Sequence, residues 1–234
     1  MVRSLRLGKL NIAAMLLAFI VVAAAAVTGF KADGAGASSG GIGMATPSTT
    51  SGPAKSATGA AAVRGTRFGN RVLREGMAGP DVTVLKSIVR SKRLLRGNLV
   101  GNFDRPTTSA VRRFQNKASM ARSGVVNKAT SKALVRSMRT GHASWYGPGL
   151  YGNGTACGKV TLRPRTIGLA HKTLPCGTRV LIGFRGKYII APVIDRGPYI
   201  RGRTWDLTAA AAKAVGLTSA GVGNVRHAIV SRGK

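Results

Sequence analysis

The hydrophobic period of the sequence changes near Gly141, and this change most limits the folds that the chain can adopt. Before it, apolar residues recur at the interval of an amphipathic helix. After it, runs rich in β-branched residues alternate with glycine turns, which is typical of a β domain. The chain of 234 residues is therefore predicted to hold two small domains, a helical one at 64–140 and a mainly β one at 141–234.

Three helices are predicted in the helical segment. The first begins at Gly79-Pro80-Asp81, where proline and aspartate suit a first turn, and the second begins near Pro106. Glycines at Gly101 and Gly124 mark the connections. The residues expected to face the core are Val82, Leu85, Ile88 and Val89 in the first helix, Ala110, Val111 and Phe114 in the second, and Ala133, Leu134 and Met138 in the third.

Two strands and one helix are predicted in the β segment. Residues 178–184 and 187–195 indicate a hairpin around a glycine turn at Arg185-Gly186. The run AAAAKAV has high helix propensity, with Thr208 as its expected N-cap and Gly216 as its C-terminal stop.

The charge of the chain is far from balanced. Lysine and arginine number 37 against six acidic residues, which gives a formal net charge of +31. Residues 64–140 alone carry a net charge of +15. Such an excess predicts a polyanionic partner. Nucleic acid is considered first but is not expected, because no nucleic-acid motif is present and the N-terminus indicates export. Wall polymers with phosphate or carboxylate groups are the alternative.

The N-terminus predicts export. Arg3, Arg6 and Lys9 precede an uncharged run of 21 residues that ends at Phe30. This run is long for a signal peptide and just reaches the length that spans a bilayer, so residues 1–30 are predicted to be either a signal peptide or a membrane anchor. Residues 31–63, rich in Gly, Ala, Ser, Thr and Pro, are predicted to form a flexible linker.

The two cysteines, Cys157 and Cys176, are predicted to form a disulfide, because an even number of cysteines in an exported chain favours one. The histidines His142, His171 and His227 are scattered without the spacing of metal ligands. No metal site and no cofactor are therefore expected.

The helical segment resembles the three-helix peptidoglycan-binding domain family along nearly its whole length. Two departures from the family pattern concern the binding pocket: Asp104-Arg105 follow the phenylalanine, and Val100 precedes Gly101. The resemblance implies peptidoglycan binding, and the alternative is a helical scaffold that binds no ligand. The matching positions are Leu73, Gly76, Gly79, Asp81, Val82, Leu85, Gly101, Phe103, Thr107, Ala110, Val111, Phe114, Gln115, Gly124, Val125, Thr130 and Leu134.

The β segment resembles the rare-lipoprotein-A family in five blocks in the right order. These blocks are ASWYG at 143–147, GTACG at 154–158, LAHKTLPCGT at 169–178, DRGPY at 195–199 and GRTWDLT at 202–208. The resemblance implies a six-stranded double-psi β-barrel, shared in outline with expansins. It also implies a peptidoglycan lytic transglycosylase, which cleaves between N-acetylmuramic acid and N-acetylglucosamine and leaves an internal anhydro ring.

Only two carboxylates occur in residues 141–234, Asp195 and Asp206. A hydrolase of the two-carboxylate type would need both, whereas a transglycosylase can act with one, because the sugar's own hydroxyl is the nucleophile. We expect Asp195 to protonate the leaving oxygen, with His171 orienting the substrate or assisting proton transfer.

Structural roles are the alternatives for two of these residues. Asp206 precedes a helix and is as readily a cap or a partner of Arg196 or Arg203 as a catalytic residue. For His171 the alternative is a hydrogen-bonded core histidine. The further residues predicted to contact the substrate are Trp145, Tyr146, Thr155, Arg196, Tyr199 and Arg203.

The aromatic members of this set could form a platform for a sugar face, although aromatic side chains in small barrels more often pack in the core. One departure bears on activity: Lys159 stands where the resembled family often has glutamate. The alternative to an enzyme is therefore an expansin-like protein that binds and loosens the wall without cutting it.

Overall fold

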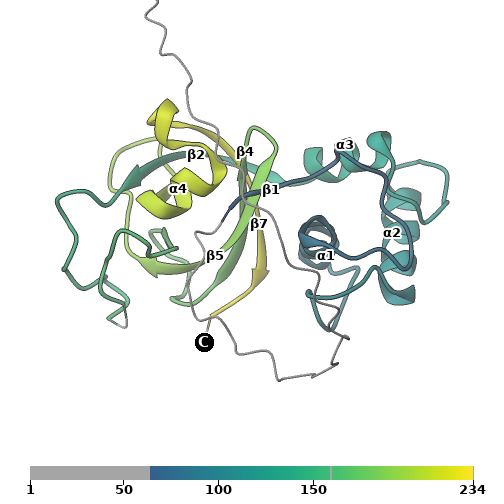
Figure 1. Ribbon diagram of the computed structural model, residues 1–234, viewed down its shortest axis with the longest axis horizontal. Helices are drawn as coiled ribbons and strands as arrows, with labels where there is room; N and C mark the ends of the chain where they lie inside the picture. Colours follow the sequence, from purple (N-terminus) through teal and green to yellow (C-terminus); the bar gives the residue numbers. More distant parts are fainter. Residues whose placement is uncertain (1–63, 159, 234) are drawn as a thin grey trace, which may run out of the picture. The chain divides into compact units, whose positions relative to one another are not determined.

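The computed structural model describes residues 64–158 and 160–233 (Figure 1). The predicted signal peptide or anchor at 1–30, the predicted linker at 31–63 and Lys159 lie outside the described residues. Within the described part, no helix is both long and apolar enough to cross a membrane. All described residues belong to one compact unit.

Three helices form where the sequence predicts them: α1 (Pro80–Ser91), α2 (Arg105–Lys117) and α3 (Lys128–Arg136). Met138, expected in the third helix, is buried but lies after its end. Local capping explains two of the starts. The Asp104 side chain accepts a hydrogen bond of 3.0 Å from the Thr107 N–H, and Asn127 caps α3 in the same way. Asp104, one of the two departures from the resembled pattern, thus has a clear local role.

Gln115 fixes the approach to α3 from within the core of the helical region. Its amide nitrogen donates to the Val125 carbonyl at 2.9 Å and to the Thr130 hydroxyl at 3.2 Å. Its amide oxygen accepts from the Gly124 N–H at 2.9 Å. Gly124 has a φ of +77°, a conformation that favours glycine. A buried amide with both ends paired specifies this turn.

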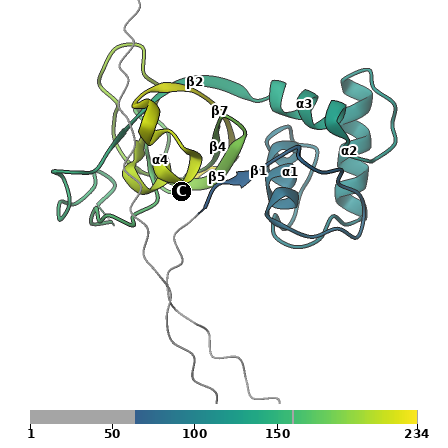
Figure 2. The ribbon, with the colours of Figure 1, turned by 45° about the horizontal axis from the view of Figure 1, so that its top comes forward.

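A closed barrel of six strands forms the β region (Figure 2). The ring runs β5-β3-β6-β2-β7-β4 and closes through the pairing of β4 with β5. The helix α4 (Ala209–Val215) and the 3-10 turn η1 (Thr218–Ala220) follow β6. The strands are β2 (Arg139–Tyr146), β3 (Leu169–Ala170), β4 (Arg179–Phe184), β5 (Lys187–Asp195), β6 (Trp205–Thr208) and β7 (Gly223–Ser231). The predicted fold class, three helices followed by a six-stranded barrel, is confirmed.

The predicted hairpin and helix are confirmed in detail. Strands β4 and β5 pair antiparallel around Arg185 and Gly186, which both have positive φ. The Thr208 hydroxyl accepts a hydrogen bond of 3.3 Å from the Ala211 N–H, and Gly216 ends α4 in the left-handed conformation.

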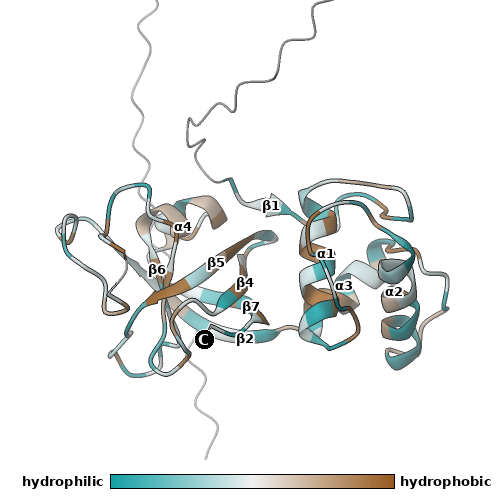
Figure 3. Ribbon diagram, turned by 90° about the horizontal axis from the view of Figure 1, so that it is seen from below, coloured by the Kyte–Doolittle hydropathy of each residue, from teal (hydrophilic) through white to brown (hydrophobic). Residues whose placement is uncertain are grey.

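A short strand that the sequence did not indicate, β1 (Thr66–Arg67), pairs with β5. One strand of the sheet therefore precedes the three helices, and the others follow them. Strand β2 begins at Arg139, just before the predicted boundary at 140/141. Helix α1 packs against β7. One hydrophobic cluster includes residues of α1 together with Leu181 and Val230 of the barrel. Figure 3 shows hydrophobic residues on both α1 and β5.

Candidate active site

Strand register aligns both carboxylates of the barrel in one row. Ala170 of β3 pairs with Asp195 of β5 on one side and with Asp206 of β6 on the other. Asp206 in turn pairs with Ser144 of β2. The register of β3 and β5 shifts between Leu169 and Ala170, so Asp195 faces the same side as Ala170 although Val193 belongs to the barrel core. Two strand spacings, on the order of 10 Å, separate the backbones at Asp195 and Asp206.

This row faces away from the barrel core. Trp205 and Leu207, the neighbours of Asp206 along β6, are buried in the core cluster of the barrel. Because successive side chains of a strand point to opposite faces, Asp206 points the other way. The two aspartates are thus fixed to the wall of a rigid barrel and are not carried by a loop.

The Asp195 carboxylate is held by backbone donors. Its Oδ1 accepts hydrogen bonds of 2.9 Å from the Ala156 N–H and 2.9 Å from the Arg196 N–H. No hydrogen bond to its Oδ2 occurs among the described residues, and the Tyr146 phenol lies close enough to this carboxylate for the two groups to affect each other. The segment GTACG at 154–158, one of the five blocks that resemble the family, therefore lies beside Asp195.

The predicted disulfide between Cys157 and Cys176 is confirmed, and it joins the loops on two sides of Asp195. The Cys157 N–H also donates to the Ile194 carbonyl at 3.2 Å. The Arg196 guanidinium donates to the Leu174 carbonyl at 3.0 Å and to the Cys176 sulfur at 3.1 Å. The guanidinium of Arg196, predicted to contact substrate, is thus engaged in holding the loop that contains Cys176.

The two carboxylates and one phenol influence one another. Burial, and then the Asp195 charge, raise the pKa of Asp206, while Ser144 and Arg203 act in the opposite direction. Burial, and then the Asp195 charge, raise the pKa of Tyr146 as well. Asp206 therefore retains a proton more readily than a solvated aspartate does, and Tyr146 stays a neutral phenol.

Asp206 takes neither the capping role nor the pairing with Arg196 that the sequence left open. Thr208, and not Asp206, caps α4. None of the ion pairs among the described residues includes Asp206, and the Arg196 guanidinium is directed to the loop before β4. Arg203 acts on Asp206 through its charge.

His171 is held as a neutral ring. Its Nδ1 accepts from the Thr173 N–H at 3.2 Å and from the Leu174 N–H at 3.1 Å. The proton of the neutral ring therefore lies on Nε2. Burial, and then the charges of Arg196 and Lys172, lower the pKa of His171. This arrangement suits a hydrogen-bond donor that orients a substrate oxygen better than it suits a base.

The Trp205 ring packs against two histidines, tilted to one and edge-on to the other. Its ring centroid lies 4.6 Å from that of His171 and 5.1 Å from that of His227. His227 is only 8% exposed, and burial, followed by the charges of Arg139 and His171, lowers its pKa to about 4. No role for His227 was predicted from the sequence. His227 is two residues from the apolar Val225 in a strand, so both side chains face the same side, and this spacing was the sequence signal that His227 is buried.

The remaining predicted contact residues differ in exposure. Tyr199 is 80% exposed and is free to stack on a ligand. Trp145 packs partly against the barrel core, as the alternative reading of the aromatics expected. Thr155 is buried beside the segment that donates to Asp195.

Several buried polar atoms of the barrel lack a hydrogen-bond partner among the described residues. Ser144 and Asp206 belong to the row of paired residues, and Tyr146 lies two residues beyond Ser144 on the same face. Buried polar groups are almost always paired in native proteins, so these atoms are available to water or to a ligand. Sequence reasoning missed Ser144. The full set is Ser144 Oγ, Tyr146 OH, Thr155 Oγ1, Trp205 Nε1, Asp206 Oδ1 and His227 Nδ1.

No group of three or more metal-ligating side chains occurs within the described ranges. The chemistry that these residues can perform is proton transfer by carboxylates beside hydrogen-bond donors and an exposed aromatic ring.

Two protein families match the chain. Residues 138–227 match the family described as "Lytic transglycolase", and residues 78–134 match the family described as "Putative peptidoglycan binding domain". The first range begins one residue before β2, and the second covers α1, α2 and most of α3, which ends at Arg136. Both predicted resemblances are confirmed.

Curated relatives match as well. A Synechocystis sp. protein named "Probable endolytic peptidoglycan transglycosylase RlpA" is 37% identical over 163 residues, which cover 69% of this chain and 46% of the relative. An Aquifex aeolicus protein of the same name is 43% identical over 84 residues, which cover 35% of this chain and 37% of the relative. The chain thus spans less than half the length of these relatives.

A solved structure, that of an expansin from Clavibacter michiganensis, is 21% identical over 41% of this chain and 51% of the expansin, with a TM-score of 0.34. A similarity at this level does not bear on function.

Proposed function

Because the chain is a rare-lipoprotein-A-like double-psi β-barrel protein with a peptidoglycan-binding type of helical domain, we propose that it is an exported endolytic peptidoglycan transglycosylase. It cleaves glycan strands between N-acetylmuramic acid and N-acetylglucosamine and leaves anhydro-muramyl ends. It acts in the cell envelope during wall remodelling.

The observation that carries this proposal is the row of Asp195, Ala170, Asp206 and Ser144 on one face of the barrel. It presents two carboxylates in different environments beside polar atoms that have no partner among the described residues. Carboxylates whose environments differ are the usual basis of acid and base roles.

The reaction needs one group that first gives and then takes a proton. Asp195 protonates the leaving oxygen as the bond from the muramic carbon to that oxygen breaks. A hydroxyl of the same muramic residue attacks that carbon and closes the anhydro ring. Its proton passes to the Asp195 carboxylate, which restores the starting state. No water is consumed, so no second carboxylate is required to activate water.

The surrounding residues support this transfer in distinct ways. His171 donates a hydrogen bond from Nε2 to a substrate oxygen, and the exposed ring of Tyr199 stacks on a sugar face. Asp206, whose pKa burial raises, is the second group at the site that can hold a proton. Trp145, Tyr146, Thr155 and Arg203 shape the site from the barrel wall and its loops.

The helical region supplies the affinity for the wall. Its family match covers α1, α2 and most of α3. Its positive charge favours wall regions that also carry anionic polymers. Contact of residues 1–30 with the membrane belongs to this proposal only if that segment is retained.

The test is incubation of the full chain and of its Asp195→Asn variant with purified sacculi, followed by mass spectrometry of the soluble products. We expect anhydro-muramyl products from the wild type and a loss of at least about a hundredfold in the variant, because removal of general acid–base catalysis costs about 10²–10⁴ in rate. Asparagine keeps the shape of the side chain, so the fold is retained.

Two further readouts separate the alternatives. Asp206→Asn is the matched control: if it abolishes the products while Asp195→Asn keeps them, proton transfer belongs to Asp206. If the wild type sediments with sacculi but releases no anhydro products, the enzyme proposal fails and an expansin-like, non-catalytic wall binder replaces it.

A further inference from the structure

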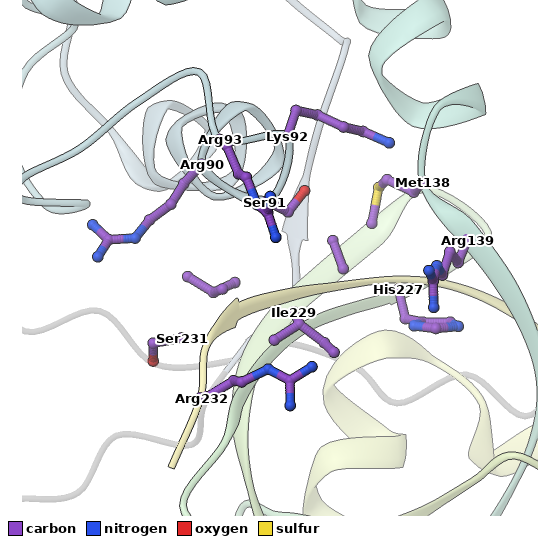
Figure 4. Close-up of a pocket in the computed structure, with 12 residues that line it drawn as sticks. Arg90, Ser91, Lys92, Arg93, Met138, Arg139, His227, Ile229, Ser231 and Arg232 are labelled. Carbon is purple, nitrogen blue, oxygen red and sulfur yellow. The ribbon is translucent and has the colours of Figure 1, made fainter. Parts of the chain in front are cut away.

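A cavity with five lysine and arginine residues in its lining lies where the end of α1 meets β2 and β7 (Figure 4). Its volume is about 400 Å³, within the range of ligand pockets. No residue of the aspartate row lines it, and none of its lining residues is acidic. We name it the basic groove. Its cationic residues are Arg90, Lys92, Arg93, Arg139 and Arg232.

These cations come from three separate parts of the chain. Basic residues at the end of a helix are often explained by the helix dipole, and this accounts for Arg90. It does not account for Arg139 at the start of β2 or for Arg232 after β7. Figure 4 shows Arg93 extending from the end of α1 toward β7 and Arg139 beside His227. The fold therefore brings together positive charges that interaction with the helix dipole does not explain.

The charges of the basic groove are not neutralised within the described residues. The cations that form ion pairs among the described residues are Arg71, Lys86 and Arg105, and none of them lines the groove. The side chains of Arg93 and Arg139 are exposed and make no hydrogen bond to described residues, and the same holds for Arg232.

The remaining two cations are fixed in place by backbone carbonyls. The Arg90 guanidinium donates to the Gly97 carbonyl and the Lys92 ammonium to the Ser137 carbonyl. Burial, and then the charge of Arg139, lower the pKa of Lys92, so the cations repel one another as the groove stands. An anion in the groove would relieve this repulsion.

The chemistry of the lining indicates the kind of anion. Four of the five cations are arginines, whose planar guanidinium groups bind phosphate and carboxylate oxygens in pairs. Met138, Ile229 and Val230 line the same cavity and suit carbon units between charged groups. The lining contains no Trp, Tyr or Phe on which a nucleic-acid base could stack.

We propose that the basic groove binds a phosphodiester polymer of the cell wall, with phosphates paired to arginines and carbon units against the apolar residues. The inference extends the proposed function, since it rests on action in the envelope. Binding here would hold the barrel beside its glycan substrate in wall regions that carry such polymers.

The test measures binding of the full chain to a fluorescent poly(glycerol phosphate) by anisotropy. The triple variant Arg93→Gln, Arg139→Gln and Arg232→Gln removes three groove charges. A matched control, Arg122→Gln, Arg136→Gln and Arg165→Gln, removes three exposed charges outside the groove. We expect the groove variant to weaken affinity by about tenfold or more and to flatten its salt dependence, and the control to weaken it by less than about twofold.

Other outcomes overturn the proposal. Equal losses in both triple variants would show diffuse charge attraction without a site. Competition by poly-glutamate as strong as that by the phosphate polymer would overturn the choice of phosphate. Tighter binding of a DNA oligomer of equal charge would assign the groove to nucleic acid.

The activity assay keeps this proposal distinct from the proposed function. On sacculi stripped of phosphate polymers, the groove variant should release as much product as the wild type. If the groove variant loses polymer binding but keeps this activity, the groove proposal is supported and the proposed function is unaffected. If the wild type binds polymer but makes no product, the proposed function fails and the groove proposal is unaffected.

Discussion

At the scale of single residues, His227 links the stability of the barrel to pH. Its pKa in the folded chain is about 4, against about 6.5 for an unfolded chain. As pH falls below about 6.5, the unfolded state takes up a proton that the folded state does not. The free energy of unfolding should therefore decrease by up to about 3 kcal/mol between about pH 6.5 and about pH 4.

Urea unfolding at several pH values in this window checks this prediction. The His227→Gln variant should show a flatter pH dependence, while the matched variant His142→Gln keeps the slope of the wild type. His171, whose pKa is also lowered, contributes with the same sign. An unchanged slope in His227→Gln would show that another group titrates.

The residues that sequence reasoning found and missed differ in one physical respect. Asp195 and the two cysteines stand in contiguous motifs, so their importance was readable from local sequence. Ser144 and His227 gain their surroundings from strand register and from packing on Trp205. Register depends on strands far apart in the chain, and a single sequence does not specify it.

At the scale of elements, the disulfide holds the loops that surround Asp195. Cys157 and Cys176 are separated by 19 residues. Closing a loop of this length stabilises the fold by about 3 kcal/mol in the chain-entropy account. The double variant Cys157→Ser and Cys176→Ser should lose about this much free energy of unfolding, as measured by chemical denaturation.

In the same variant, the fractional loss of activity should exceed the fractional loss of binding to sacculi. The reason is that Ala156, next to Cys157 in the disulfide-bonded loop, donates a hydrogen bond to Asp195. Reduction of the wild type with a thiol serves as the control and should reproduce both effects. A variant with wild-type stability and product yield would contradict the assigned role of the bridge.

Which elements could be predicted also has a physical basis. Helices α1, α2 and α4 begin at residues that act locally, namely Pro80, Pro106 and Thr208. Strands β1 and β3 contain two residues each and exist only through pairing with distant strands, β1 with β5 and β3 with both β5 and β6. Short strands of this kind carry too little periodicity to be recognised from sequence.

At the scale of the whole molecule, the helices and the barrel share part of their hydrophobic core. The sequence predicted separate domains at 64–140 and 141–234, since each has its own period. In the structure, Leu181 and Val230 of the barrel belong to the same cluster as Leu85 and Ile88 of α1. The strand β1 also joins the barrel before the helices begin. Such coupling favours one cooperative unfolding transition.

The variant Leu181→Ala tests this coupling. Leu181 is fully buried, so its truncation should cost about 2–5 kcal/mol. Because the core is shared, hydrogen exchange should speed up in the helices as well as in the barrel, including at the Gly124 N–H that is bonded to Gln115. Arg179→Gln, an exposed change in the same strand, should leave exchange in the helices unaffected. Faster exchange confined to the barrel, or two separate melting transitions, would show that the helical region and the barrel unfold independently.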